Sequence, residues 1–256
     1  MSRVHGADQS RRGVLAWLLC GACAHHGGPR KLSIAAAADL SFALDELARE
    51  FRKSHPSIEP AIAYGSSGNF YAQIRNGAPF DLFLSADVEY PRRLAHDGLA
   101  AALPVFVYGV GRIVVWVPAA SPLDPATALR APTVRHVAIA NPQHAPYGRA
   151  AEEALRSLGV YDSVERKLVL GENISQTLEF VESGAADVGV VALSLAIAPP
   201  LAGRGRYWEV PLQAYTKMEQ GGVILKDSTA AREFRAWLVA PAGRAILKRY
   251  GFYLPD

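Results

Sequence analysis

The sequence is poor in cysteine. Among 256 residues only Cys20 and Cys23 are cysteines, and both lie near the N-terminus, so we expect no disulfide in the fold. The chain also lacks an uncharged apolar run of the roughly 20 residues that a spanning helix needs. Its formal net charge is only +3, with lysine and arginine dispersed along the chain. This excludes the clustered basic surface that is typical of a nucleic-acid-binding protein.

The first 24 residues have the pattern of an export signal. Arg11 and Arg12 precede an apolar run over 13–24, and Ala22-Cys23-Ala24 offers small residues for cleavage. We therefore predict a signal peptide over 1–24 and a periplasmic location. The paired arginines are similar to a twin-arginine signal, which exports a folded chain. Lipidation of Cys23 is the less favoured alternative, because Cys20 is a poor residue three positions before the modified cysteine.

After this segment, short apolar stretches rich in β-branched residues alternate with stretches of helical period, which predicts an α/β fold. The predicted strands are Leu32–Ala36, Ile58–Tyr64, Leu82–Ser85, Arg112–Val117, Val137–Ala140, Leu168–Leu170, Val188–Val191 and Tyr207–Val210. The predicted helices are Ser41–His55, Asn69–Asn76, Pro91–His96, Gly148–Leu158, Ser175–Ser183, Ala230–Val239 and Ala242–Tyr250.

Three junctions between a predicted strand and a helix have an unusual composition. They span 35–41, 64–69 and 141–148, are rich in small, hydroxyl or amide residues, and contain no lysine or arginine. Unpaired N–H groups and the helix dipole attract anions to helix starts, and Ser66 and Ser67 add hydroxyl donors. The alternative is that these serines and glycines only cap helices. Three such junctions in one exported chain favour an anion site.

At these residues the chain resembles the periplasmic molybdate-binding proteins. The similar segments are Lys31–Ala38, Gly65–Gly68 with Gln73-Ile74, Gly77–Asp87, Asn141–Gly148 and Lys248–Phe252. The resemblance implies a type II periplasmic binding protein with two α/β lobes, a mixed sheet in each, and a cleft between them. It implies lobe 1 over 31–113 and 212–256 and lobe 2 over 114–211. The implied ligand is molybdate or tungstate, and the implied partners of this monomer are the membrane subunits of an ABC importer.

Carried over by position, the contacts of this family fall on Asp39, Ser67, Tyr147, Ile174 and Ala192. Ser41 and Ser66 are further candidate donors in the same junctions. Asp39 stands where many members of the family have serine, and Ala192 where some have a tyrosine that binds the ligand.

The carboxylate of Asp39 would repel a bound dianion. Either Asp39 turns away and caps the helix at Ser41, which we favour, or the ligand is a protonated oxyanion such as phosphate or arsenate and Asp39 accepts its proton.

Other classes of function have weaker support. His55, His96, His136 and His144 lack the spacing of metal ligands, so we expect neither metal nor cofactor. We expect no enzyme, because no nucleophile with a base and no G-x-S-x-G motif is present. An extracytoplasmic ligand-sensing domain stays as an alternative, since such domains share this two-lobed fold.

Overall fold

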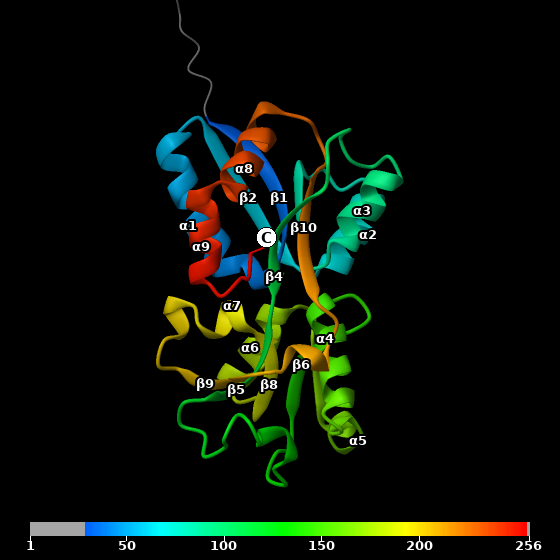
Figure 1. Ribbon diagram of the computed structural model, residues 1–256, viewed down its shortest axis with the longest axis vertical. Coiled ribbons are helices and arrows are strands. Elements are labelled where there is room, and N and C mark those ends of the chain that lie inside the picture. The colour runs from blue at the N-terminus through cyan, green and yellow to red at the C-terminus, as the bar shows by residue number, and fades with distance from the viewer. Residues whose placement is uncertain (1–28, 255–256) are drawn as a thin grey trace, which may run out of the picture.

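The computed structural model describes residues 29–254, so the predicted signal peptide lies outside the described residues. Figure 1 shows two α/β lobes stacked along the long axis of the molecule, each built on its own sheet. Both sheets are five-stranded, with the strand orders β2-β1-β3-β10-β4 and β7-β6-β8-β5-β9. The prediction of a two-lobed α/β protein with a mixed sheet in each lobe is therefore confirmed.

The first sheet mixes parallel and antiparallel pairs. Strand β1 runs parallel to β2 and β3, whereas β10 is antiparallel to β3 and β4. Its strands are β1 (Arg30–Ala37), β2 (Ile58–Gly65), β3 (Leu82–Ser85), β4 (Phe106–Gly111) and β10 (Met218–Ile224).

The second sheet repeats this arrangement. Strand β6 is parallel to β7 and β8, and β5 is antiparallel to β8 and β9. Its strands are β5 (Ile113–Pro118), β6 (Val137–Ala140), β7 (Leu168–Gly171), β8 (Val188–Ala192) and β9 (Gly205–Glu209). The chain thus changes sheets between Gly111 and Ile113, and returns between Glu209 and Met218.

Helices cover both sheets (Figure 1). Those of the first lobe are α1 (Ser41–Ser54), α2 (Ser67–Arg75), α3 (Glu89–His96), α8 (Thr229–Val239) and α9 (Pro241–Arg249). Those of the second lobe are α4 (Pro146–Ser157), α5 (Tyr161–Val164), α6 (Ile174–Glu182) and α7 (Leu193–Ala196). Short 3-10 turns complete the described chain: η1 (Ala38–Leu40), η2 (Ala128–Arg130), η3 (Glu165–Lys167), η4 (Pro199–Leu201) and η5 (Leu212–Ala214). Within residues 29–254, no helix is both long and apolar enough to cross a membrane.

Helix α1 illustrates how the sequence pattern produces the packing. Leu44, Leu47 and Phe51 recur at three- and four-residue spacing and are fully buried. Each buried side chain of this size stabilises the fold by roughly 1.5–3 kcal/mol. The Phe51 ring packs edge-on against Phe234 of α8, with centroids 5.0 Å apart. The helix ends at Ser54 because Pro56 disfavours helical geometry at the preceding His55.

Strands β4 and β10 were not predicted, because their glycines lower the strand propensity. The packing requires two of these glycines. A Cβ on Gly221 would lie 2.5 Å from Val88 Cγ2, and one on Gly222 would lie 2.4 Å from the Phe106 ring. Packing therefore requires glycine at these two positions of β10, which lie inside a strand and not in a turn.

Candidate anion site

Four helix starts meet at the boundary between the lobes. Turn η1 follows β1 and α2 follows β2, while α4 and α6 follow β6 and β7 of the second sheet. These strands run parallel to their partners, so their carboxyl ends lie at the same edge of each sheet. Ligands of open α/β sheets bind at this edge. The two edges face each other across the lobe boundary.

A small cavity lies where these helix starts meet. Its free volume is about 10 Å³, roughly the space of one water-sized probe. The lining residues are Ala37, Ala38, Asp39, Gly65, Ser66, Ser67, Ala86, Ala145, Pro146, Tyr147 and Ile174. None of these described lining residues is a lysine or an arginine, so the donors there are amides and hydroxyls.

Five of the seven residues predicted to bind the ligand line this cavity: Asp39, Ser66, Ser67, Tyr147 and Ile174. The other two do not. Ser41 lies in the first turn of α1, where its carbonyl accepts a hydrogen bond from the Tyr64 hydroxyl at 3.2 Å. Ala192 is fully buried at the end of β8, paired with Ile113.

The start of α2 contributes two serines with different partners. Ser66 is the N-cap, and its Oγ accepts the Asn69 N–H at 3.3 Å. Ser67, the first helical residue, is only 1% exposed, and its Oγ accepts the Ala86 N–H at 3.0 Å. Because this contact uses the oxygen of Ser67 as an acceptor, its hydroxyl proton is left for a ligand.

The starts of α4 and α6 contribute backbone amides. No hydrogen bond is found within residues 29–254 for the N–H groups of Ser67, Tyr147 or Ile174, which lie in first helical turns. Helix α4 lies close to β6 because Gly148 has no side chain. A Cβ on Gly148 would lie 2.2 Å from the Ala140 carbonyl oxygen. Glycine at position 148 therefore lets the start of α4 lie against the sheet edge.

The prediction that Asp39 caps the helix at Ser41 is wrong. The N-cap of α1 is Leu40, and no side chain bonds to the helix start. Asp39 lies in η1 and is 1% exposed. Its Oδ2 accepts hydrogen bonds from the Tyr147 hydroxyl at 2.9 Å and from Gln220 Nε2 at 2.7 Å. The carboxylate of Asp39 therefore bonds to two buried donors at the lobe boundary and not to the start of α1.

Burial also changes the ionisation of Asp39. Loss of solvent raises the pKa of its carboxyl group from the usual 3.8 to about 6, against the lowering effect of the Gln220 and Tyr147 hydrogen bonds. Gln220 was not predicted as part of the site. Gln220 lies in strand β10, which was not predicted because of its glycines. In the structure its side chain is fully buried, and a buried polar side chain indicates a specific hydrogen-bond partner.

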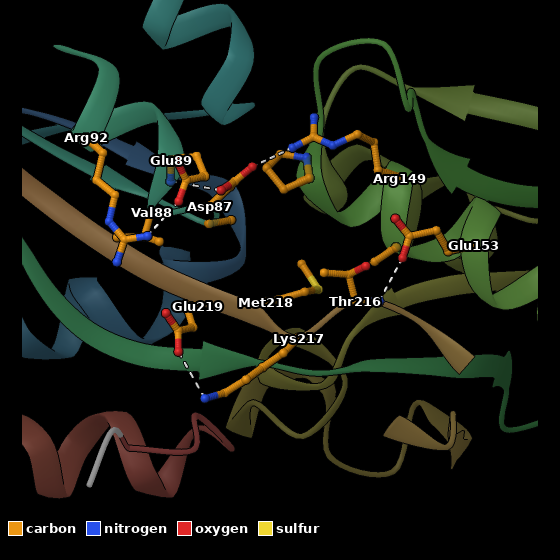
Figure 2. A pocket seen from close by; sticks show the side chains of 13 residues that line it. Asp87, Val88, Glu89, Arg92, Arg149, Glu153, Thr216, Lys217, Met218 and Glu219 are labelled. Carbon is orange, nitrogen blue, oxygen red and sulfur yellow. Dashed lines mark hydrogen bonds and ion pairs between the residues drawn. The ribbon is translucent and has the colours of Figure 1, made fainter. Parts of the chain in front are cut away.

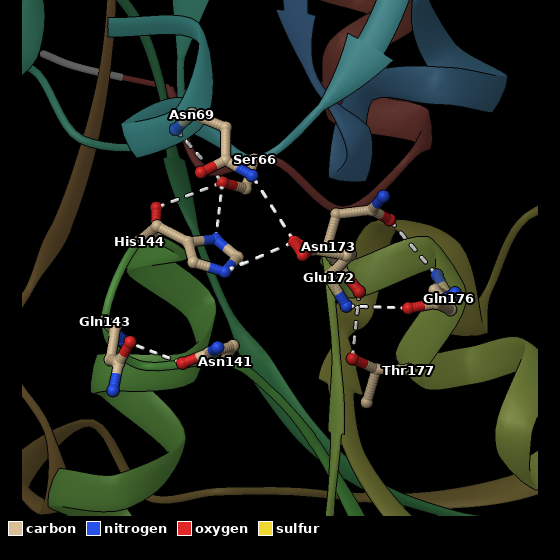
Figure 3. A network of polar contacts seen from close by, with 9 residues as sticks. All are labelled: Ser66, Asn69, Asn141, Gln143, His144, Glu172, Asn173, Gln176 and Thr177. Carbon is tan, nitrogen blue, oxygen red and sulfur yellow. Dashed lines mark hydrogen bonds and ion pairs between the residues drawn. The ribbon is translucent and has the colours of Figure 1, made fainter. Parts of the chain in front are cut away.

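Polar contacts across the lobe boundary surround the cavity. Ser66 Oγ lies 2.9 Å from His144 Nδ1, and Asn69 Nδ2 donates to Glu172 Oε2 at 3.3 Å. Figure 3 shows both contacts as dashed lines. The Gly68 amide donates to the His144 carbonyl at 2.9 Å. In each case one partner belongs to α2 or its cap and the other to a loop of the second lobe. The lobes are therefore in contact around the cavity.

A larger groove of about 460 Å³ lies beside β10. Figure 2 shows that its cations are paired with carboxylates: Arg92 with Glu89, Arg149 with Asp87, and Lys217 with Glu219. These pairs leave no net positive field for an anion. Among the described residues, moreover, no three His, Cys, Asp or Glu side chains gather to hold a metal ion.

Two lobes that meet around a small cavity of helix N-termini define a binding protein for a small solute. Comparison with known proteins identifies the family. The chain belongs to the bacterial extracellular solute-binding proteins, whose family model matches residues 32–253. Membership places the chain outside the cytoplasm.

Individual relatives are similar over most of the chain. The molybdate-binding protein ModA of Rhodobacter capsulatus is 41% identical over 193 residues, covering 74% of this chain and 75% of the relative. ModA of Azotobacter vinelandii is 37% identical over 232 residues, covering 88% and 90%. The solved periplasmic molybdate-binding protein of Azotobacter vinelandii superposes with a TM-score of 0.82 at 35% identity, covering 88% of this chain and all of that one. The sulfate-binding protein SubI of Mycobacterium tuberculosis, at 18% identity and a TM-score of 0.71, shares the fold.

Proposed function

We propose that this chain captures a tetrahedral oxyanion, molybdate or tungstate, in the periplasm and delivers it to an ABC importer. The observation that carries the proposal is the meeting of helix starts at the lobe boundary, where the Ser67 hydroxyl and the first amides of α2, α4 and α6 are available as donors. The space between them holds about one water-sized probe, so the lobes must separate slightly to admit a tetrahedral oxyanion. Relatives named as molybdate-binding proteins support the same ligand.

The chemistry of the lining suits an anion that has only acceptors. Molybdate and tungstate carry no proton at neutral pH, so all four oxygens accept hydrogen bonds. Buried amide and hydroxyl groups bind such an ion without a cation, because they are oriented before it arrives and aligned with helix dipoles. Ser41 and Ala192 lie outside this lining, so the cavity does not support their predicted contacts.

Binding is proposed to work by closure of two lobes. We propose lobe 1 over 31–113 and 212–256, and lobe 2 over 114–211. The bound anion would accept hydrogen bonds from both lobes and so hold them together. The contacts of Ser66 and Gly68 with His144 form only when the lobes meet. A closed monomer is then the form that the membrane subunits of the importer recognise. The predicted twin-arginine signal over 1–24 would deliver the folded chain to the periplasm.

Isothermal titration tests the proposal. The purified chain without residues 1–28 is titrated at neutral pH with molybdate, tungstate, sulfate and phosphate. We expect one molar equivalent of molybdate or tungstate to bind, with phosphate much weaker. Binding of phosphate alone would favour the protonated-oxyanion alternative, and no binding of any of the four anions would contradict the proposed function.

A further inference from the structure

Asp39 is an unusual group to find at an anion site. Among the described residues, it is the only acidic one that lines the cavity, and none of them that line it is a lysine or arginine that could compensate the negative charge. A carboxylate and a bound dianion within a few ångströms would repel each other in a region that excludes water. The repulsion disappears if the carboxyl group carries a proton.

The hydrogen bonds of Asp39 determine where such a proton would lie. Oδ2 already accepts from the Tyr147 hydroxyl and from Gln220 Nε2. Oδ1 is buried and has no partner within the described residues. A proton on Oδ1 would turn this unpartnered acceptor into a donor beside the cavity, while Oδ2 kept both of its contacts.

The groups that face Asp39 from the other elements carry no positive charge, so burial outweighs the Gln220 and Tyr147 hydrogen bonds, which by themselves favour the ionised form. These groups are Tyr147 from α4, Tyr108 from β4, Gln220 from β10, and Ser194 from α7, whose hydroxyl donates to the Asp39 carbonyl at 2.8 Å. None of these groups is a cation. Burial raises the pKa of Asp39 to about 6 before any ligand is present, and a nearby dianion would raise it further.

We propose that Asp39 takes up one proton when the chain binds its oxyanion, and that the Oδ1–H then donates a hydrogen bond to a ligand oxygen. This inference rests on the proposed function and specifies its chemistry: the proton comes from solvent and stays on the protein. It makes Asp39 a residue that selects a fully ionised oxyanion, which has an acceptor for this proton. A protonated oxyanion would instead bring its own proton to the carboxylate.

Proton uptake is measured directly by titrating the chain with sodium molybdate at pH 7.5 in buffers of different ionisation enthalpy. The slope of the observed enthalpy against the buffer enthalpy gives the number of protons bound. We expect about one proton, and an affinity that falls about tenfold per pH unit between roughly pH 6.5 and 8.5. This measurement on the unmodified chain needs no variant to fold.

Asp39→Asn is the diagnostic variant, because its carboxamide oxygen can replace Oδ2 and its NH₂ group can donate in place of Oδ1–H. We expect it to bind molybdate without proton uptake and with less than about twofold change over the same pH range. Asp45→Asn is the matched control, since Asp45 also accepts a tyrosine hydroxyl, that of Tyr64 at 2.6 Å, but is exposed on α1. Its proton uptake should equal that of the unmodified chain.

The outcomes separate this inference from the proposed function. Tight molybdate binding without proton uptake, or uptake that persists in Asp39→Asn, would overturn the role of Asp39 and leave the oxyanion function standing. Absence of molybdate binding to the unmodified chain would overturn both. Preferred binding of inorganic phosphate without proton uptake would show that the ligand supplies the proton.

Discussion

The amide of Gly68 and the carbonyl of His144 join the two lobes by a backbone hydrogen bond of 2.9 Å. Gly68 lies in the first turn of α2, and His144 lies just before α4. A Cβ at position 68 would be 2.4 Å from the His144 oxygen and 2.9 Å from its Cα. Both are backbone atoms, which cannot rotate away as a flexible side chain does. The closed arrangement therefore requires glycine at this position.

Gly68→Ala should impair closure while leaving each lobe folded. Overpacking of this kind costs about 1–3 kcal/mol, which corresponds to roughly 5- to 150-fold weaker molybdate binding. Titration calorimetry measures the loss, and small-angle scattering with the ligand present should show a more open molecule. Gly109→Ala is the control, because its Cβ would meet Phe252 Cβ at an ordinary 3.4 Å. Equal affinities of the two variants would contradict the requirement for glycine.

Ser67→Ala should weaken molybdate binding by about 1–3 kcal/mol, because a hydroxyl donor is lost and the Ala86 N–H loses its acceptor. Ser228→Ala provides the comparison. Ser228 caps α8 and accepts the Ala231 N–H at 3.2 Å, away from the cavity. It should lower the free energy of unfolding by about 1 kcal/mol with no change in affinity. Unchanged binding by Ser67→Ala would remove Ser67 from the site.

Asp39 should make the stability of the ligand-free chain depend on pH. Its pKa is about 6 when folded and near 3.8 when unfolded, so the folded chain holds this proton more tightly. The stabilisation is fully present below about pH 4 and is lost as the pH rises through about 6. At about 1.4 kcal/mol per pKa unit, the loss is about 3 kcal/mol by neutral pH.

The difference in the free energy of unfolding between Asp39→Asn and the unmodified chain isolates this effect. Urea denaturation of both at pH 4 and pH 7 should show the variant gaining about 2 kcal/mol relative to the unmodified chain between the two values, because part of the effect is already lost at pH 4. A difference that does not change with pH would mean that Asp39 ionises as freely in the folded chain as in the unfolded one.

The ion pair of Arg149 with Asp87 should contribute a small, salt-dependent part of the free energy that favours the closed lobes. Arg149 donates to Asp87 of the first lobe at 2.7 Å, and both side chains are partly exposed. Arg149→Gln should therefore weaken molybdate binding by only about 0.2–1 kcal/mol, and less at high salt. Arg156→Gln is matched to it, since Arg156 pairs with Glu152 within α4. An equal effect of both variants would assign the change to the helix rather than to the contact between lobes.

Most of the fold could be predicted because local patterns and packing agree. Short apolar segments between helical segments predicted β3 and β6 with the same first and last residues as in the structure. The apolar face of α1 predicted the burial of Leu44, Leu47 and Phe51. Strand β10 was not predicted because it contains Gly221 and Gly222. Glycine is required there because a larger residue would collide with Val88 and Phe106. Both neighbours are distant in sequence, so no local pattern contains that information.

The place of Ser66 and Ser67 at the start of α2 was predictable, because hydroxyl residues between glycines mark a helix N-terminus. Their contact with a ligand stays a prediction. The role of Asp39 was mistaken because a capping preference is local, whereas its two partners lie 108 and 181 residues away along the chain. The buried carboxyl group of Asp39 is recognised only in the structure, where Tyr147 of α4 and Gln220 of β10 come together at η1.

The position of the bound anion tests the proposed site most directly. Crystals of the chain grown with molybdate give an anomalous signal from molybdenum, which locates the ion without interpretation of its shape. We predict one strong peak within hydrogen-bond reach of Ser67 Oγ, the Tyr147 and Ile174 amides, and Asp39 Oδ1. A peak in the groove lined by Arg92, Arg149 and Lys217 would contradict the proposed site.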